Sequence, residues 1–158
     1  MKHAYTSLAT VLIIIVLTGC QSSLKNNLNN EASLTAHDEL PENPLLLVPL
    51  TSSINPRDNT MSTLYGNKLA AAYAGTQASN FYPKGSVLYE VTWKQQPDSV
   101  WFGGNIPKEI FSVERIFFTD AGIPEYELYK GTPLRKSTDK NNVERVVFIS
   151  SQRMAVTP

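Results

Sequence analysis

The sequence predicts an α+β domain, built mainly from an antiparallel β-sheet with one or two helices. Several short segments alternate apolar and polar residues, which is the period of a half-buried strand. Proline, glycine and aspartate separate these segments at short intervals. Short strands joined by turns favour antiparallel pairing, because parallel strands need long crossover connections.

One helix is expected, from Asn59 or Thr60 to about Tyr73, after an irregular entry segment at residues 49–58. Apolar residues recur at helical spacing on one face, namely Met61, Leu64, Tyr65, Leu69, Ala72 and Tyr73. The alanines at 70–72 favour helix, and Gly75 is a suitable stop.

Four strands are expected after this helix, at residues 86–96, 110–119, 125–129 and 143–150. Turn residues at 97–99 and 120–122 and a turn-rich stretch at 130–142 separate them. Residues 100–107 are expected to form a loop in which large aromatic side chains stand beside glycines.

The first 20 residues have the pattern of an export signal. A basic start is followed by an apolar run at 11–17, too short to span a bilayer, and then by small residues. Residues 17–20, Leu-Thr-Gly-Cys, resemble the bacterial lipobox, in which the cysteine is lipidated and becomes the first residue. Cys20 is also the only cysteine, and lipidation would explain a lone cysteine in an exported protein.

The expected organisation is a signal peptide at 1–19, a lipidated Cys20 with a flexible tether at 20–44, and one domain at 45–158. The partner of the anchor is a membrane. By resemblance to Gram-negative lipoproteins, Gln21 in place of aspartate favours the outer membrane, with the domain facing the periplasm.

Composition excludes several function classes. Removing residues 1–19 removes one of the 14 basic residues and none of the 14 acidic ones, so the formal charge becomes −1. This balance gives no electrostatic footprint for nucleic acid. His37 is the last of two histidines, so the domain has no histidine for a triad or a zinc site.

Three segments together resemble the cytochrome P460 family. They are residues 60–67, Thr-Met-Ser-Thr-Leu-Tyr-Gly-Asn, then residues 82–94, which hold a Pro-Lys-Gly turn and end in Trp-Lys, and then residues 113–118, Val-Glu-Arg-Ile-Phe-Phe. The resemblance implies a helix with Gly-Asn near its middle, a turn into a strand, and a further strand. Members that bind haem also tend to form dimers, so a homodimer is an expectation.

The resemblance implies a c-type haem, but this chain lacks the means to hold one covalently. Family members attach haem through Cys-x-x-Cys-His near the C-terminus, whereas residues 143–158 contain neither Cys nor His. Glu90 falls about where cross-linking members have a lysine. No covalent cofactor is therefore expected. Noncovalent haem would need another ligand, and the candidates are Tyr65, Tyr73, Tyr82, Tyr89, Met61 and Met154.

The candidate ligand-binding residues are aromatic side chains and one acid: Tyr89, Glu90, Trp93, Trp101 and Phe102. The aromatics could line a pocket, or they could pack in the core as aromatics of small β domains commonly do. Glu90 could face Glu114 from a neighbouring strand as a catalytic carboxylate pair, or each could pair with Lys94 or Arg115.

Three functions remain open. The first is a binding lipoprotein with a P460-like scaffold that takes a small apolar ligand or noncovalent haem. The second is a redox enzyme with a noncovalent cofactor. The third is a structural envelope component that docks onto another protein, which an exposed apolar patch at Trp101 and Phe102 would favour.

Overall fold

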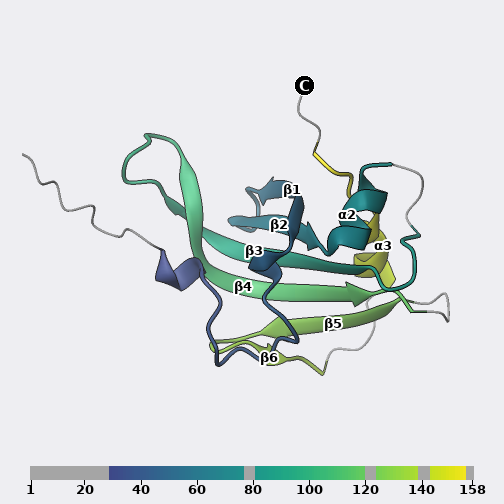
Figure 1. Cartoon of the computed structure of the whole chain (residues 1–158). Coiled ribbons are helices and arrows are strands. Elements are labelled where there is room, and N and C mark those ends of the chain that lie inside the picture. Colours follow the sequence, from purple (N-terminus) through teal and green to yellow (C-terminus); the bar gives the residue numbers. More distant parts are fainter. Residues whose placement is uncertain (1–28, 77–80, 120–123, 139–142, 156–158) are drawn as a thin grey trace, which may run out of the picture.

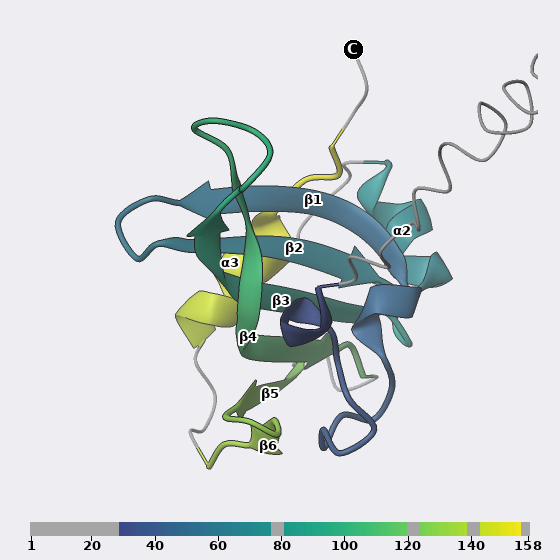
Figure 2. The ribbon, with the colours of Figure 1, turned by 90° about the vertical axis from the view of Figure 1, so that its left-hand side faces the viewer.

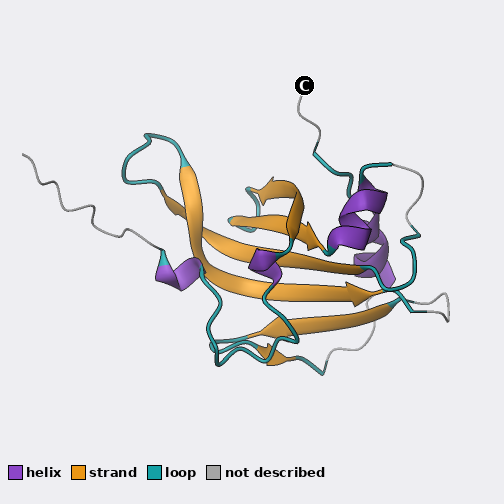
Figure 3. Ribbon diagram, in the orientation of Figure 1, coloured by secondary structure: helices purple, strands orange, loops and turns teal. Residues whose placement is uncertain are grey.

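A computed structural model describes residues 29–76, 81–119, 124–138 and 143–155 of the 158-residue chain. Six antiparallel strands form one sheet in chain order (Figures 1 and 3). They are β1 (Val48–Asn55), β2 (Thr60–Gly66), β3 (Val87–Pro97), β4 (Asn105–Phe117), β5 (Glu125–Lys130) and β6 (Arg135–Lys136). The predicted α+β class, mainly antiparallel sheet, is confirmed.

Two α-helices pack against one end of this sheet, α2 (Lys68–Ala74) and α3 (Val143–Ser151). Two short 3-10 helices, η1 (Asn30–Ala32) and η2 (Pro44–Leu46), belong to the segment that precedes β1. Among the described residues, none of the helices is long and apolar enough to cross a bilayer.

The predicted helix from residue 59 or 60 to 73 is wrong in its first half, which is β2. This strand lies between β1 and β3, and both of its faces are partly covered, so apolar residues occur at odd and even positions. Met61, Leu64 and Tyr65 therefore imitate a helical spacing although they point to opposite faces. The helix itself begins after Asn67 and ends at Gly75, the predicted stop.

Asn67 decides where the strand ends and the helix begins. Its side-chain oxygen accepts a hydrogen bond from Ala70 N at 2.9 Å, which caps α2. Its amide Nδ2 donates to Gly85 O at 2.8 Å, and its backbone N donates to Val87 O at 3.1 Å. Gly66-Asn67 thus lies at a strand–helix junction, not in the middle of a helix as the resemblance implied.

Two further expectations about secondary structure are wrong. Residues 143–150, predicted as a strand, form α3, because a short apolar run suits a buried strand and a buried helix equally well. Residues 49–58, predicted as irregular, largely form β1. This strand is largely exposed and lies at the edge of the sheet, where polar residues are tolerated. The strands expected at 86–96, 110–119 and 125–129 are present as β3, β4 and β5, but β4 already begins at Asn105, within the loop expected at 100–107.

The sheet has a separate apolar core on each face. The first face is covered by α2 and α3, whose Ala70, Ala74 and Ile149 pack on Leu64, Leu88 and Ile116. The second face buries residues of the alternate register: Val87, Tyr89, Val91, Trp93, Val113, Tyr129 and Leu134. Residues i and i+1 of each strand therefore belong to different cores.

The segment before β1 covers the second core, so the flexible tether predicted at 20–44 does not extend over residues 29–44. Leu34, Leu40 and Leu45 pack against that core, and Trp93 Nε1 donates to Ala32 O at 2.9 Å. Figure 2 shows η1 in front of β3 and β4. Spaced leucines within a polar stretch carry this packing, although the stretch has no helical or strand period.

Candidate functional site

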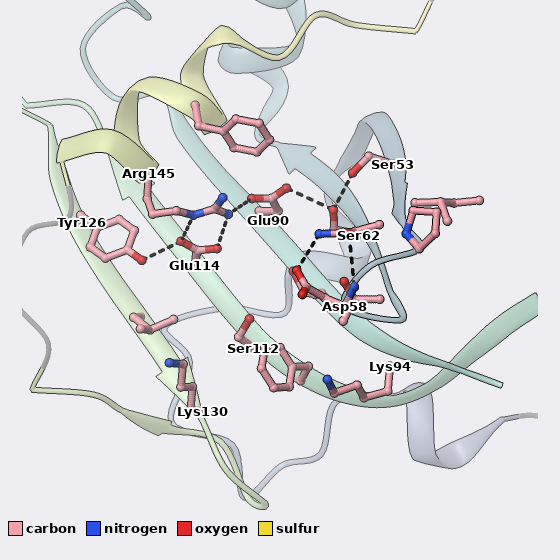
Figure 4. Close-up of a pocket in the computed structure, with 18 residues that line it drawn as sticks. Ser53, Asp58, Ser62, Glu90, Lys94, Ser112, Glu114, Tyr126, Lys130 and Arg145 are labelled. Carbon is pink, nitrogen blue, oxygen red and sulfur yellow. Dashed lines mark hydrogen bonds and ion pairs between the residues drawn. The ribbon is translucent and has the colours of Figure 1, made fainter.

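A groove of about 790 Å³ lies on the first face of the sheet, beside the part that α2 and α3 cover. Its floor comes from β2, β3, β4 and β5, and its walls come from α3 and from β1 with the turn after it (Figure 4). Polar side chains dominate the floor, namely Thr60, Ser62, Glu90, Thr92, Lys94, Ser112, Glu114 and Tyr126. This half of the first face therefore carries no apolar core.

Two carboxylates stand directly opposite each other at the centre of this floor. Glu90 of β3 pairs in register with Glu114 of β4, and their side chains are 3% and 7% exposed. Like charges at directly opposed positions destabilise a sheet, and burial increases that cost. A nearby cation would offset this cost.

Arg145 of α3 supplies that cation. Its Nη2 lies 2.6 Å from Glu90 Oε2 and 2.6 Å from Glu114 Oε2, and its Nε donates to Glu114 Oε1 at 2.9 Å. The hydrogen bond with Glu114 raises the pKa of Arg145, against the opposing effect of burial. The guanidinium thus holds both carboxylates at once (Figure 4).

Neutral donors satisfy the remaining carboxylate oxygens. Glu90 Oε1 accepts from Ser62 Oγ at 3.1 Å and from Gln152 Nε2 at 3.0 Å. Glu114 Oε1 also accepts from Tyr126 Oη at 2.6 Å. Burial and this hydrogen bond raise the pKa of Tyr126, so the phenol stays a donor.

The cluster is more suited to rigid binding than to proton transfer. Each of the four carboxylate oxygens already accepts a hydrogen bond, so neither acid is poised as a free general base. The hypothesis that Glu90 and Glu114 face each other is confirmed. Their partner, however, is Arg145, neither Lys94 nor Arg115.

The other end of the groove carries two lysines and an aromatic ring. Lys94 Nζ lies 4.2 Å from the centre of the Phe111 ring, a cation–π contact. Lys130 stands across from it, on β5 (Figure 4). Three acidic residues, Asp58, Glu90 and Glu114, and three basic ones, Lys94, Lys130 and Arg145, line the groove, so its formal charge is balanced.

The five predicted ligand-binding residues do not form one site. Glu90 lines the groove, but Tyr89 and Trp93 lie on the opposite face of the sheet, 0% and 6% exposed. Tyr89 Oη donates to Glu42 Oε1 at 3.3 Å, and burial is the main cause that raises its pKa. Tyr89 and Trp93 therefore pack in a core, as the alternative interpretation held.

Trp101 and Phe102 lie in a third place, at the tip of the hairpin between β3 and β4. Their side chains are 73% and 108% exposed, and neither lines the groove. The predicted lipidation site, Cys20, lies outside the described residues.

The groove does not fit the haem that the resemblance implies. None of the described residues that line it is His, Cys or Met, and its one tyrosine, Tyr126, is engaged with Glu114. The candidate iron ligands lie elsewhere; for example, Tyr82 packs between Tyr73 and Phe118. Within the described ranges, no group of three or more His, Cys, Asp or Glu side chains could hold a metal.

Three residues of the site, Arg145, Gln152 and Tyr126, were missed by sequence reasoning. Arg145 does not stand out in the sequence, because a strand at 143–150 would not bring it to Glu90 and Glu114, whereas the helix α3 does. A usable signal existed: two acids at matching positions of adjacent predicted strands require a cation, and Arg145 is one of few basic residues near the C-terminus.

Comparison with family models and with curated protein sequences gives no match. No protein-family model matches the chain, and no curated protein sequence matches it. The function is therefore argued from the site itself.

Proposed function

We propose that this protein is a lipid-anchored envelope lipoprotein whose groove binds a small polar ligand of balanced charge. The observation that carries the proposal is the Glu90–Arg145–Glu114 cluster, a costly charge arrangement that forms the floor of an open groove. Well-packed apolar residues would fill the same face at lower cost, as they do at Leu64, Leu88 and Ile116.

The lining indicates the chemistry of the ligand. Hydroxyl groups of Thr60, Ser62, Thr92 and Ser112 stand between acids and bases of equal number, which suits a ligand with hydroxyl, amide or zwitterionic groups. Phe111 and Phe148 add two apolar surfaces at the sides. The volume lies within the roughly 300–1,000 Å³ typical of small-molecule sites. The small apolar ligand expected from the sequence is less suited to this floor.

The scaffold is proposed to be P460-like without covalent haem. The motifs that carried the resemblance, Gly66-Asn67 and the Pro83–Gly85 turn, are joined by the hydrogen bond from Asn67 Nδ2 to Gly85 O, although Gly66-Asn67 lies at a strand–helix junction and not within a helix. Residues distant in the sequence thus form one structural unit. The anchor at Cys20 and an outer-membrane location remain part of the proposal, supported by the lipobox-like sequence.

The ligand is tested by thermal unfolding with defined compound classes: free amino acids, mono- and disaccharides, fatty acids and haemin. A ligand at 100 times its Kd stabilises the folded state by about 2.7 kcal/mol, which is easily measured. We expect a rise in Tm with an amino acid or saccharide, and none with fatty acid or haemin.

A matched pair of variants places the binding site. Thr92→Trp fills the groove, whereas Thr63→Trp makes the same change at a half-buried position on the opposite face of the neighbouring strand. We expect the first variant to abolish the ligand-induced Tm rise and the second to keep it. Equal responses in both variants, or a response to haemin alone, would contradict the proposal.

The anchor is tested separately, by mass spectrometry of protein purified from bacterial membranes. We expect diacylglyceryl mass on a chain that begins at Cys20, and release of Cys20→Ser into the soluble fraction. An unmodified Cys20 in membrane-derived protein would remove the lipoprotein part of the proposal and leave the groove untouched.

A further inference from the structure

The hairpin that joins β3 and β4 extends past the rest of the sheet, at the end away from α2 and α3 (Figure 1). Its strands keep pairing out to Pro97 and Asn105, beyond two irregularities of register near Trp93. At its base, Gln95 Nε2 donates to Thr60 O at 2.6 Å, so the arm is fixed to the sheet.

The tip of this hairpin is ordered and apolar. The Asp98 carboxylate accepts from Val100 N at 2.7 Å and Trp101 N at 3.3 Å, and Gly103 takes the positive φ of 80° that closes the turn. This frame holds three consecutive apolar side chains in solvent, Val100, Trp101 and Phe102, and Val100 is 80% exposed. Nothing in the described part of the chain covers them.

The number of residues between Asn29 and Cys20 limits how far the anchor can lie from this tip. Asn29, the first described residue, donates from Nδ2 to Pro107 O at 2.5 Å, and η1 contacts β4. Nine peptide steps from Asn29 back to Cys20 span at most about 30 Å. The five peptide steps from Pro107 to Phe102 span only about 17 Å, so the tip can reach the plane of a lipid anchored at Cys20.

We propose that the tip formed by Val100, Trp101 and Phe102 inserts into the bilayer that holds the Cys20 anchor, as a second membrane contact. The proposal rests on the lipid anchor proposed above. Tryptophan and phenylalanine partition into the membrane interface, and the local Asp98 carboxylate is bound to backbone amides. The contact orients the domain, because a single attachment point becomes two.

Charge on the arm indicates that insertion is apolar and not electrostatic. The nearest charged residues on β4, Lys108 and Glu109, form an ion pair of 3.2 Å, which leaves no basic patch for anionic headgroups. Binding of the tip should therefore be the same in zwitterionic and anionic vesicles and should be insensitive to salt.

The test uses the chain from Cys20 to Pro158, coupled through its single thiol to maleimide lipids in phosphatidylcholine vesicles. Coupling replaces natural lipidation, so a failed anchor and a failed insertion give different results. Tryptophan emission is measured in vesicles with and without dibrominated acyl chains. The Trp101→Phe variant shows how much of this emission comes from Trp101. The buried Trp93 serves as an internal control.

We expect a blue shift and several-fold quenching of the Trp101 component by brominated lipid, with Trp93 unaffected. Phe102→Ser should reduce the quenching while leaving the thermal midpoint unchanged, because the side chain is exposed. Equal Trp101 emission in vesicles with and without dibrominated acyl chains would overturn the proposal. A blue shift that depends on protein concentration without vesicles would also overturn it, and would identify a second copy of the chain as the occupant.

Discussion

Strand β4 carries a charge cluster on each face, and the two clusters are assembled in different ways. On the second face, Arg115 stands in register with Glu127 of β5, and Nη1 lies 2.9 Å from Oε2. On the first face, Glu114 stands in register with Glu90, an acid against an acid. One pair is balanced within the sheet, whereas the other is balanced only by Arg145 of α3.

The difference shows which cluster depends on tertiary structure. The Arg115–Glu127 pair forms whenever β4 and β5 pair, and Tyr129 and Lys136 add further donors to Glu127 from the same part of the sheet. The Glu90–Glu114 pair disfavours the pairing of β3 and β4 until α3 docks. The cluster on the first face thus links the docking of α3 to the floor of the groove.

Removal of the bridging cation should have the largest effect. Arg145→Met leaves two nearly buried carboxylates facing each other, and we expect a loss of about 2–4 kcal/mol, less than for a fully buried pair because Arg145 is 35% exposed. Urea unfolding measures this loss.

A double-mutant cycle sharpens this prediction. Glu90→Gln in the Arg145→Met background removes one of the opposed charges, so part of the stability should return. Destabilisation that Glu90→Gln leaves unchanged would show that Arg145 acts through packing, for example of its guanidinium on Phe148, 4.8 Å away.

Lowering the pH should weaken the cluster on the second face, which is centred on Glu127. Burial alone would raise the pKa of Glu127, but hydrogen bonds from Lys136, Tyr129 and Arg115 outweigh it and lower the pKa to about 2. A depressed pKa adds stability above the unfolded value, about 4.3, and this is lost as the pH falls toward 2. We expect about 1–3 kcal/mol to disappear over that window.

The matched variant for acid sensitivity is Glu127→Gln, which should flatten this part of the stability–pH curve. Carboxyl resonances followed by NMR report the pKa directly. A Glu127 that titrates at an ordinary glutamate value would contradict the prediction.

A smaller effect is expected at two tyrosines, each of which donates to a carboxylate of one cluster. Tyr126 Oη donates to Glu114 at 2.6 Å on one face, and Tyr129 Oη donates to Glu127 at 2.8 Å on the other. Replacing either by phenylalanine should cost about 1–2 kcal/mol, because a largely buried carboxylate loses one donor. Only Tyr126→Phe should also weaken ligand binding, since only Tyr126 lines the groove. An equal effect of both variants on ligand affinity would show that the ligand does not bind in the groove.

The smallest effect is expected at Lys136, whose side chain is 53% exposed although its Nζ lies 2.5 Å from Glu127 Oε1. Lys136→Met should cost less than about 1 kcal/mol, because solvent and salt screen an exposed pair. Chemical denaturation at low and high salt checks this, and a loss as large as that of Arg145→Met would break the contrast between the two clusters.

The site was only half accessible from the sequence. That Glu90 and Glu114 could face each other was predictable, because they lie on two strands that follow each other in the sequence and pair as a hairpin. Tyr89 and Trp93 were assigned to the same pocket as Glu90, although strand alternation puts Tyr89 and Glu90 on opposite faces. Arg145 could not be placed, because an apolar run of this length does not distinguish helix from strand.

The sequence by itself determined the fold class, three of the six strands and the helix stop at Gly75, since these depend on local alternation and turn residues. Only the tertiary structure decided that residues 60–66 are a strand, that residues 143–151 are a helix, and that residues 29–44 cover the second core. Each of these segments has an ambiguous or absent period, and its conformation follows from the partner it packs against. Where the local pattern fits a helix and a strand equally well, the packing partners in the rest of the chain decide the conformation.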